Sequence, residues 1–206
     1  MSSGLSTIKN VAIFGSADIT PDHEVYQAAY ETAKTLGSLG LRIVNGGGPG
    51  VMKAATDGAR AGGGKSLAVT FHPVNAPYFE GRDQTNFADE EVVVEDYFKR
   101  LGGLIEASEA FVIFQGGTGT LSEWTTVWLL SHIYYGHHKP IVLFGEYWHD
   151  VMATMNEHFF IGKLENEVYR IVTQVDMVLP ALRELEMELL TVQAKLAEGQ
   201  GLGDDV

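Results

Sequence analysis

The stretch Gln115–Glu123, QGGTGTLSE, places three glycines and two threonines between the apolar run AFVIF and a long amphipathic run. Glycine lets backbone N–H groups approach a ligand closely, and the helix that follows offers unpaired N–H donors and a positive dipole end. The stretch therefore predicts a seat for a phosphate group. The candidate residues are Gly116, Gly117, Thr118, Gly119 and Thr120.

The same stretch also fits a purely structural motif. Thr120-Leu-Ser-Glu123 matches the S/T-x-x-E capping box, in which Thr120 would cap the helix and Glu123 would bind a backbone N–H. On spacing alone, Glu123 is equally a cap or a functional carboxylate. Three glycines directly after an apolar strand favour a ligand that approaches the backbone.

Two other apolar runs, Val11–Phe14 and Leu41–Val44, end in similar loops of small residues. In an open α/β sheet, ligands bind beyond the carboxyl ends of the strands, where the strand order reverses. All three loops are therefore expected at one edge of the sheet, although close helix–strand packing is an alternative for the second. The residues that these two loops add to the predicted phosphate or nucleotide site are Gly15, Ser16, Gly46, Gly47 and Gly48.

Two familiar nucleotide-binding patterns are incomplete. Gly58–Ser66 ends like a Walker A loop, but Ala59 stands where that pattern needs glycine. Gly46-x-Gly48 lacks the third glycine of the dinucleotide fingerprint, because position 51 is Val51. The sequence favours neither an ATPase nor a standard NAD enzyme.

The elements that must position these loops alternate between short apolar runs and segments of helical period. The predicted strands are Val11–Phe14, Leu41–Val44, Leu67–Phe71, Glu91–Val94, Phe111–Phe114, Ile141–Phe144 and Tyr169–Val172. The predicted helices are Asp22–Leu36, Val51–Arg60, Tyr97–Ala107, Leu121–Tyr135, Tyr147–His158 and Asp176–Glu198. This alternation predicts one α/β domain over 1–206, a doubly wound and mostly parallel Rossmann-like sheet flanked by helices, with a C-terminal helix over 176–198 and a flexible tail over 199–206.

Composition excludes several classes of protein. The formal net charge of −13 argues against general binding to nucleic acid or to anionic membranes, and no run of residues is apolar enough to span a bilayer. The chain has no cysteine, so disulfides and Cys-ligated zinc are excluded. His137 and His138 lie in a turn without metal-ligand spacing, and solvated or hydrogen-bonding histidines are the favoured interpretation. We expect a cytoplasmic protein with no metal and no cofactor.

The segments NGGGPGVMKAATDGA and QGGTGTLSE, together with FGSA and GHHKPIVLFG, resemble the signatures of the LONELY GUY family over about Val11 to Ile161. Members of this family are cytokinin-activating phosphoribohydrolases that are often mislabelled lysine decarboxylases. The resemblance implies hydrolysis of the N-glycosidic bond of a nucleoside 5′-monophosphate. It implies a catalytic pair formed by Glu123 and Arg100, with Ser16, Gly117, Gly119 and Thr120 at the phosphate.

The chain departs from the family pattern at four positions, which are Gln115, Leu101, Leu104 and Ser122. Leu101 replaces a lysine, and this change removes a cation from beside an anionic substrate. The departures keep a second interpretation open, in which the chain binds a nucleotide or molybdenum cofactor without cleaving it. The resemblance also implies a homodimer, near whose interface we expect Trp124 and Trp128.

Overall fold

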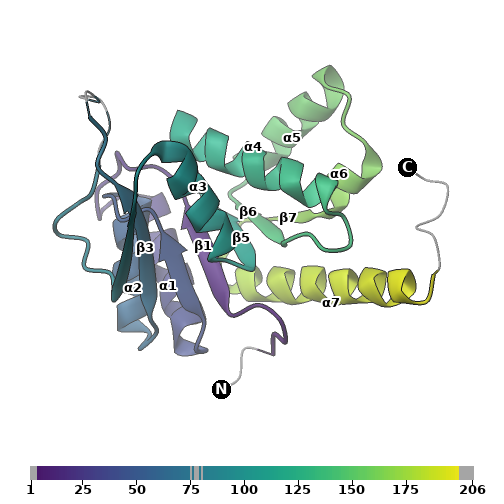
Figure 1. Cartoon of the computed structure of the whole chain (residues 1–206), viewed down its shortest axis with the longest axis horizontal. Coiled ribbons are helices and arrows are strands. Elements are labelled where there is room, and N and C mark those ends of the chain that lie inside the picture. Colours follow the sequence, from purple (N-terminus) through teal and green to yellow (C-terminus); the bar gives the residue numbers. More distant parts are fainter. Residues whose placement is uncertain (1–3, 75, 77–78, 80, 200–206) are drawn as a thin grey trace.

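The computed structural model describes residues 4–74, 76, 79 and 81–199 (Figure 1). Within these residues the chain forms a seven-stranded sheet in the order β4-β3-β2-β1-β5-β6-β7, and every neighbouring pair is parallel. The predicted doubly wound α/β fold is confirmed. The strands are β1 Asn10–Phe14, β2 Arg42–Asn45, β3 Ser66–Phe71, β4 Glu90–Val94, β5 Ala110–Ile113, β6 Ile141–Phe144 and β7 Tyr169–Val172.

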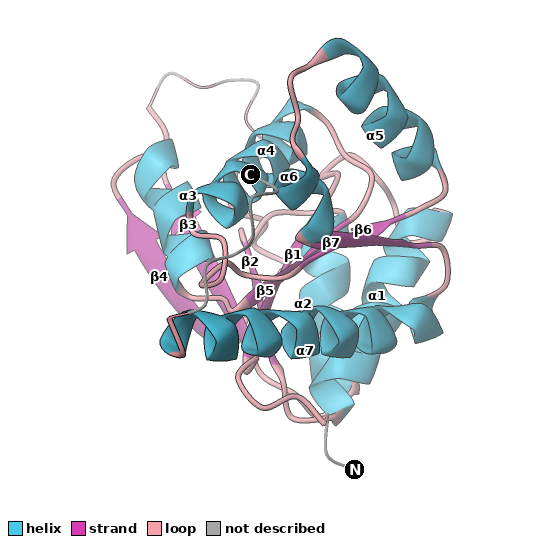
Figure 2. Ribbon diagram, turned by 90° about the vertical axis from the view of Figure 1, so that its right-hand side faces the viewer, coloured by secondary structure: helices cyan, strands magenta, loops and turns pink. Residues whose placement is uncertain are grey.

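Helices cover both faces of this sheet (Figure 2). They are α1 Glu24–Ser38, α2 Val51–Ala61, α3 Tyr97–Glu106, α4 Thr118–Ile133, α5 Tyr147–His158, α6 Lys163–Glu167 and α7 Val178–Ala197. Because side chains alternate along a strand, Val11 and Ile13 of β1 pack with α1, α2 and α7, whereas Ala12 and Phe14 pack with α3, α4 and α5. The short helix α6 was not predicted from the sequence.

The strand order reverses between β1 and β5. From β1 the chain builds outward through β2, β3 and β4, and it then returns to the other side of β1 to place β5, β6 and β7. Phe14 at the end of β1 lies in register with Ile113 at the end of β5. The loops that follow these two strands therefore diverge from a single point, which is where α/β sheets of this kind bind ligands.

The C-terminal helix packs on the chain's own domain. It begins with a 3-10 turn, Val175–Met177, continues as α7, and buries Leu182 and Leu185 in the core formed with α1 and α2. The carboxylate of its buried Glu186 accepts hydrogen bonds from the backbone N–H groups of residues 6, 7 and 8. Most of the predicted tail, residues 200–206, lies outside the described residues. Among the described helices, none combines the length and apolar character that crossing a membrane requires.

Candidate active site at the strand switch

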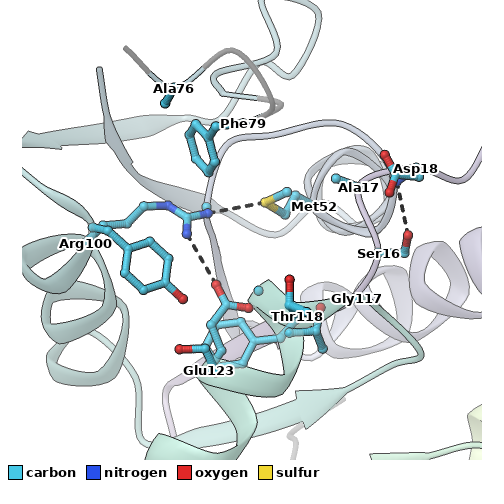
Figure 3. Close-up of a pocket in the computed structure, with 17 residues that line it drawn as sticks. Ser16, Ala17, Asp18, Met52, Ala76, Phe79, Arg100, Gly117, Thr118 and Glu123 are labelled. Carbon is cyan, nitrogen blue, oxygen red and sulfur yellow. Dashed lines mark hydrogen bonds and ion pairs between the residues drawn. The ribbon is translucent and has the colours of Figure 1, made fainter. Parts of the chain in front are cut away.

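A cleft of about 910 Å³ lies beyond the carboxyl ends of β1 and β5. Residues from the loops after β1, β2 and β5 and from the first turn of α3 line it (Figure 3). The sequence-predicted residues that line the cleft are Gly15, Ser16, Gly46, Arg100, Gly117, Thr118, Gly119, Thr120 and Glu123. Gly47, Gly48 and Gly116 do not line it.

Arg100 and Glu123 form an ion pair in this cleft. Nη1 of Arg100 lies 3.3 Å from Oε1 of Glu123, and the two residues are only 5% and 8% exposed. The two groups face each other although they lie 23 positions apart in the chain. Removing two charged groups from water has a large desolvation free energy. Their mutual attraction offsets this free energy only when further contacts hold the pair in a good geometry.

Three neighbours fix the guanidinium of Arg100. Its Nε donates to the carbonyl of Val69 at 3.2 Å, and its Nη2 lies 3.6 Å from the sulfur of Met52. The third neighbour is Gly46, where an added Cβ would lie 1.5 Å from Nη2. Any residue other than glycine at position 46 would therefore occupy the space of the guanidinium.

Helix α4 begins at Thr118, three residues earlier than predicted. Its N-cap is Gly117, which makes no side-chain capping bond, and the first-turn hydrogen bond joins Leu121 N–H to the Gly117 carbonyl at 3.0 Å. Thr120 therefore lies inside the first turn and Glu123 in the second. The capping-box interpretation is wrong, because glycine begins the helix and the carboxylate of Glu123 pairs with Arg100 instead.

The first turn of α4 presents its backbone to open space. A Cβ added to Gly117 or to Gly119 would meet no heavy atom of the described chain within 4 Å. The first N–H groups of a helix have no partner within the helix, and the dipole makes this end positive. The turn can therefore hold an anionic group in the cleft.

The loop after β1 is fastened to the loop after β5. Ser16 N–H donates to the Gln115 carbonyl at 2.9 Å, and the Ser16 carbonyl accepts from Val51 N–H at 2.8 Å. A Cβ added to Gly116 would lie 2.1 Å from Oγ1 of Thr120, so glycine is required for close packing at that position. The connections hold the Ser16 hydroxyl and the start of α4 at the same cleft.

The loop after β2 holds the segment that follows β3. The Gly47 carbonyl accepts from Asp83 N–H at 3.0 Å, and the Gly48 carbonyl accepts from the Asn86 side chain at 2.8 Å. Gly47 has a φ of 70°, which favours glycine. Packing within the protein thus accounts for these two glycines.

Other residues that line the cleft were not among the predicted site residues, and they include Asp18, Met52, Phe79 and Tyr97. For Tyr97 a signal existed, since it stands three positions before Arg100 on a predicted helix and must share a face with it. Phe79 follows β3 in a segment without helical or strand pattern, and nothing in the sequence pointed to it. Of the four departures from the family pattern, Leu101 and Leu104 are buried and do not line the cleft.

The remaining aromatic and histidine candidates lie in the scaffold. Trp124 and Trp128 stack with ring centroids 5.2 Å apart and are buried in the core beside Trp148, so packing within the chain accounts for these two tryptophans. His137 is exposed, whereas His138 is buried and its Nδ1 accepts from Gly136 N–H at 3.2 Å. Burial lowers the pKa of His138 to about 4. No group of three potential metal ligands occurs among the described residues.

Comparisons with known proteins bear on this site. A family model described as "Possible lysine decarboxylase" matches residues 52–185. The chain is also 32% identical over 178 residues to a protein of Mycobacterium tuberculosis named cytokinin riboside 5′-monophosphate phosphoribohydrolase, a match that covers 84% of this chain and 91% of the relative. The chain belongs to the LONELY GUY family.

A second LONELY GUY relative, from Mycobacterium marinum, carries the same name and is 32% identical over 141 residues, or 68% of this chain and 72% of that protein. Among solved structures, the molybdenum cofactor carrier protein of Chlamydomonas reinhardtii aligns with a TM-score of 0.62 at 19% identity, covering 85% of this chain and 96% of that one. At such identity the likeness shows a shared fold alone.

Proposed function

We propose that this LONELY GUY protein hydrolyses the N-glycosidic bond of a nucleoside 5′-monophosphate and releases the free base and ribose 5-phosphate. The observation that carries the proposal is the buried Arg100–Glu123 pair, which stands in the strand-switch cleft beside the open first turn of α4. The names of the mycobacterial relatives support the same reaction.

In this proposal the phosphate binds where the β1 and β5 loops meet. The backbone N–H groups of Thr118 and Gly119 and the hydroxyls of Ser16 and Thr120 are the donors. The open space beside Gly117 and Gly119 supports this placement, because a phosphate needs close access to the backbone. Because the net charge of the chain is −13, an anionic ligand needs a local binding site with favourable donors.

The sugar then faces the ion pair. A water oxygen forms a bond to C1′ while the C1′–N bond breaks, the electron pair of that bond stays on the base, and the proton that the water releases ends on the base. Positive charge develops on the ribosyl ring as the bond lengthens, and the carboxylate of Glu123 stabilises it. Arg100 holds this carboxylate toward the sugar, and its planar fork of donors can also contact the substrate.

The test is an assay for free base and ribose 5-phosphate after incubation of the purified protein with AMP and related nucleotides. We expect products with the wild type. Glu123→Gln keeps the size of the side chain but removes its charge, and it should lower turnover by roughly 10²- to 10⁴-fold. Glu157→Gln, at an exposed carboxylate on α5, is the matched control and should keep wild-type turnover.

Arg100 is tested by Arg100→Lys, because Arg100→Ala leaves Glu123 without the guanidinium and can reduce stability as well as turnover. Lysine keeps the charge but loses the planar fork, so turnover should fall while the protein stays folded. Lys99→Ala changes the neighbouring exposed cation of α3 and serves as the control. A protein whose melting temperature rises with AMP but which forms no product would be a binding protein without catalysis, the second interpretation of the sequence.

The proposal includes a homodimer. On α4 the apolar side chains of Leu121, Leu129 and Ile133 are exposed and lie on one face, because they are spaced by multiples of four residues. Exposed apolar side chains arranged in this way support a protein contact. Sedimentation at micromolar concentration should give the mass of two chains, and the mass of one chain would contradict the pairing.

A further inference from the structure

Tyr97 lines the cleft, and no described residue pairs with its side-chain hydroxyl. It is the first residue of α3 and stands one turn before Arg100 on the same helical face. Its ring contacts Phe71 edge-on with centroids 6.3 Å apart, and Phe71 contacts Phe79 at 4.8 Å. Tyr97 and Phe79 therefore form an aromatic wall on the part of the cleft next to Arg100.

The hydroxyl of Tyr97 is buried and has no hydrogen-bond partner among the described residues. Buried polar groups are nearly always paired, so an unpaired one in a cleft indicates a partner that binds there. Tyr147 and Trp148 also carry buried polar atoms without a partner in the described part of the chain, but neither residue lines the cleft. The phenol hydroxyl can donate to a ligand atom and also accept from one.

The arrangement of the cleft decides which part of a nucleotide would reach this hydroxyl. Figure 3 shows Arg100 on the left and Ser16 and Asp18 on the right, with Glu123 between them at the bottom of the view and Phe79 above Glu123. A phosphate beside Ser16 and a ribose beside Glu123 would direct the base toward Phe79 and the neighbouring Tyr97. An aromatic wall with a single hydroxyl suits a flat heteroaromatic ring with an acceptor nitrogen.

We propose that Tyr97 is the residue that binds the base, with its hydroxyl meeting the edge of the base and donating a hydrogen bond to a ring nitrogen. This inference rests on the proposed function and names the group that recognises the departing half of the substrate. As the C1′–N bond breaks, its electron pair moves onto the base, and a hydrogen bond to a base nitrogen strengthens. Tyr97 therefore contributes to turnover as well as to binding.

The experiment uses Tyr97→Phe, which removes one oxygen and keeps the ring on Phe71. Dissociation constants of AMP and of ribose 5-phosphate are measured by calorimetry for Glu123→Gln and for Glu123→Gln with Tyr97→Phe, so that hydrolysis does not disturb the titration. AMP should bind roughly tenfold more weakly without the hydroxyl, and ribose 5-phosphate, which has no base, should bind equally to both. In the otherwise wild-type protein, Tyr97→Phe should lower kcat for AMP at least as strongly.

A matched control and the pattern of outcomes separate this inference from the proposed function. Tyr134→Phe makes the same change at an exposed tyrosine and should alter neither affinity nor kcat. If ribose 5-phosphate binds both proteins and AMP affinity is unchanged by Tyr97→Phe, the inference is overturned and the proposed function stands. If neither ligand binds, both are overturned. Equal melting temperatures for Tyr97→Phe and wild type exclude a folding defect as the cause of weaker AMP binding.

Discussion

The loop after β5 and the loop after β2 are both rich in glycine, yet the space beside their glycines is used differently. At Gly117 and Gly119 an added Cβ would meet no described heavy atom within 4 Å. At Gly46 and Gly48 it would meet Arg100 at 1.5 Å and Met52 at 2.4 Å. The first loop leaves the space beside its glycines open, whereas the second fills the space with the protein's own side chains.

This difference shows that two loops of similar glycine content can have different structural roles. In the β5 loop glycine exposes the N–H groups of a helix start, and in the β2 loop it makes room for the guanidinium that faces Glu123. In our proposal the two loops are therefore complementary parts of one site, since one receives the phosphate and the other leaves room for Arg100 beside Glu123. Substitutions at their glycines should have different consequences.

The largest effect is expected for Gly46→Ala. The methyl group cannot coexist with the guanidinium of Arg100, so the side chain must leave its position beside Glu123. We expect turnover to fall about a hundredfold or more, with a loss of folding stability of up to about 3 kcal/mol as the buried pair is broken. Product assays and thermal melts measure the two effects.

The control for this variant is Gly102→Ala, in the same helix as Arg100, where an added Cβ meets nothing within 4 Å of the described chain. It should keep wild-type activity. Wild-type turnover in Gly46→Ala would mean that the position of Arg100 does not matter for the reaction.

A smaller effect, with opposite signs for stability and binding, is expected for Gly119→Ala. Alanine is favoured over glycine in a helix, and the site is free of contacts, so stability should rise by about 0.5 kcal/mol. The methyl group would enter the space of the proposed phosphate, and the affinity for ribose 5-phosphate should fall roughly tenfold. Unchanged affinity would place the phosphate elsewhere, and the contrast between the two loops would lose its functional meaning.

The smallest effect at neutral pH is expected for His138, which follows α4 and lies outside both loops. A change at this residue should alter the stability of the protein in acid without altering turnover. Burial lowers the pKa of His138 from 6.5 to about 4, so the folded protein binds fewer protons than the unfolded chain between these values. Stability should therefore be fully present above pH 6.5 and decrease by on the order of 3 kcal/mol as the pH falls toward 4. Measuring the free energy of unfolding at a series of pH values checks this prediction.

His138→Gln removes the titrating group while leaving an acceptor for Gly136 N–H. The variant should lose most of this acid sensitivity and keep wild-type turnover at neutral pH. If the pH dependence were the same in both proteins, His138 would not be its source.

Local patterns in the sequence were sufficient to predict the fold. Short apolar runs placed all seven strands within one residue of their observed bounds, and alternation with helices predicted the parallel sheet. The start of α4 was predicted too late because the capping-box pattern at Thr120 competes with a glycine N-cap, whose geometry leaves no signature in the sequence. The start of α4 is therefore set by tertiary packing and not by the local helix propensity of the sequence.

The site could be predicted only in part for a similar reason. The glycine loops and the Arg100–Glu123 candidates follow from motifs and from the family resemblance. The contact between Gly46 and Arg100 joins residues 54 positions apart, and no local pattern encodes it. The aromatic wall likewise forms only when Phe71, Phe79 and Tyr97 come together from three different segments.

The most direct test of the central claim is a crystal structure of the Glu123→Gln variant with AMP bound. We predict the phosphate within hydrogen-bond distance of the backbone N–H groups of Thr118 and Gly119, the ribose beside residue 123, and the base against Tyr97. A nucleotide bound outside the strand-switch cleft, or one with its phosphate at Tyr97 and its base at Gly119, would contradict the account.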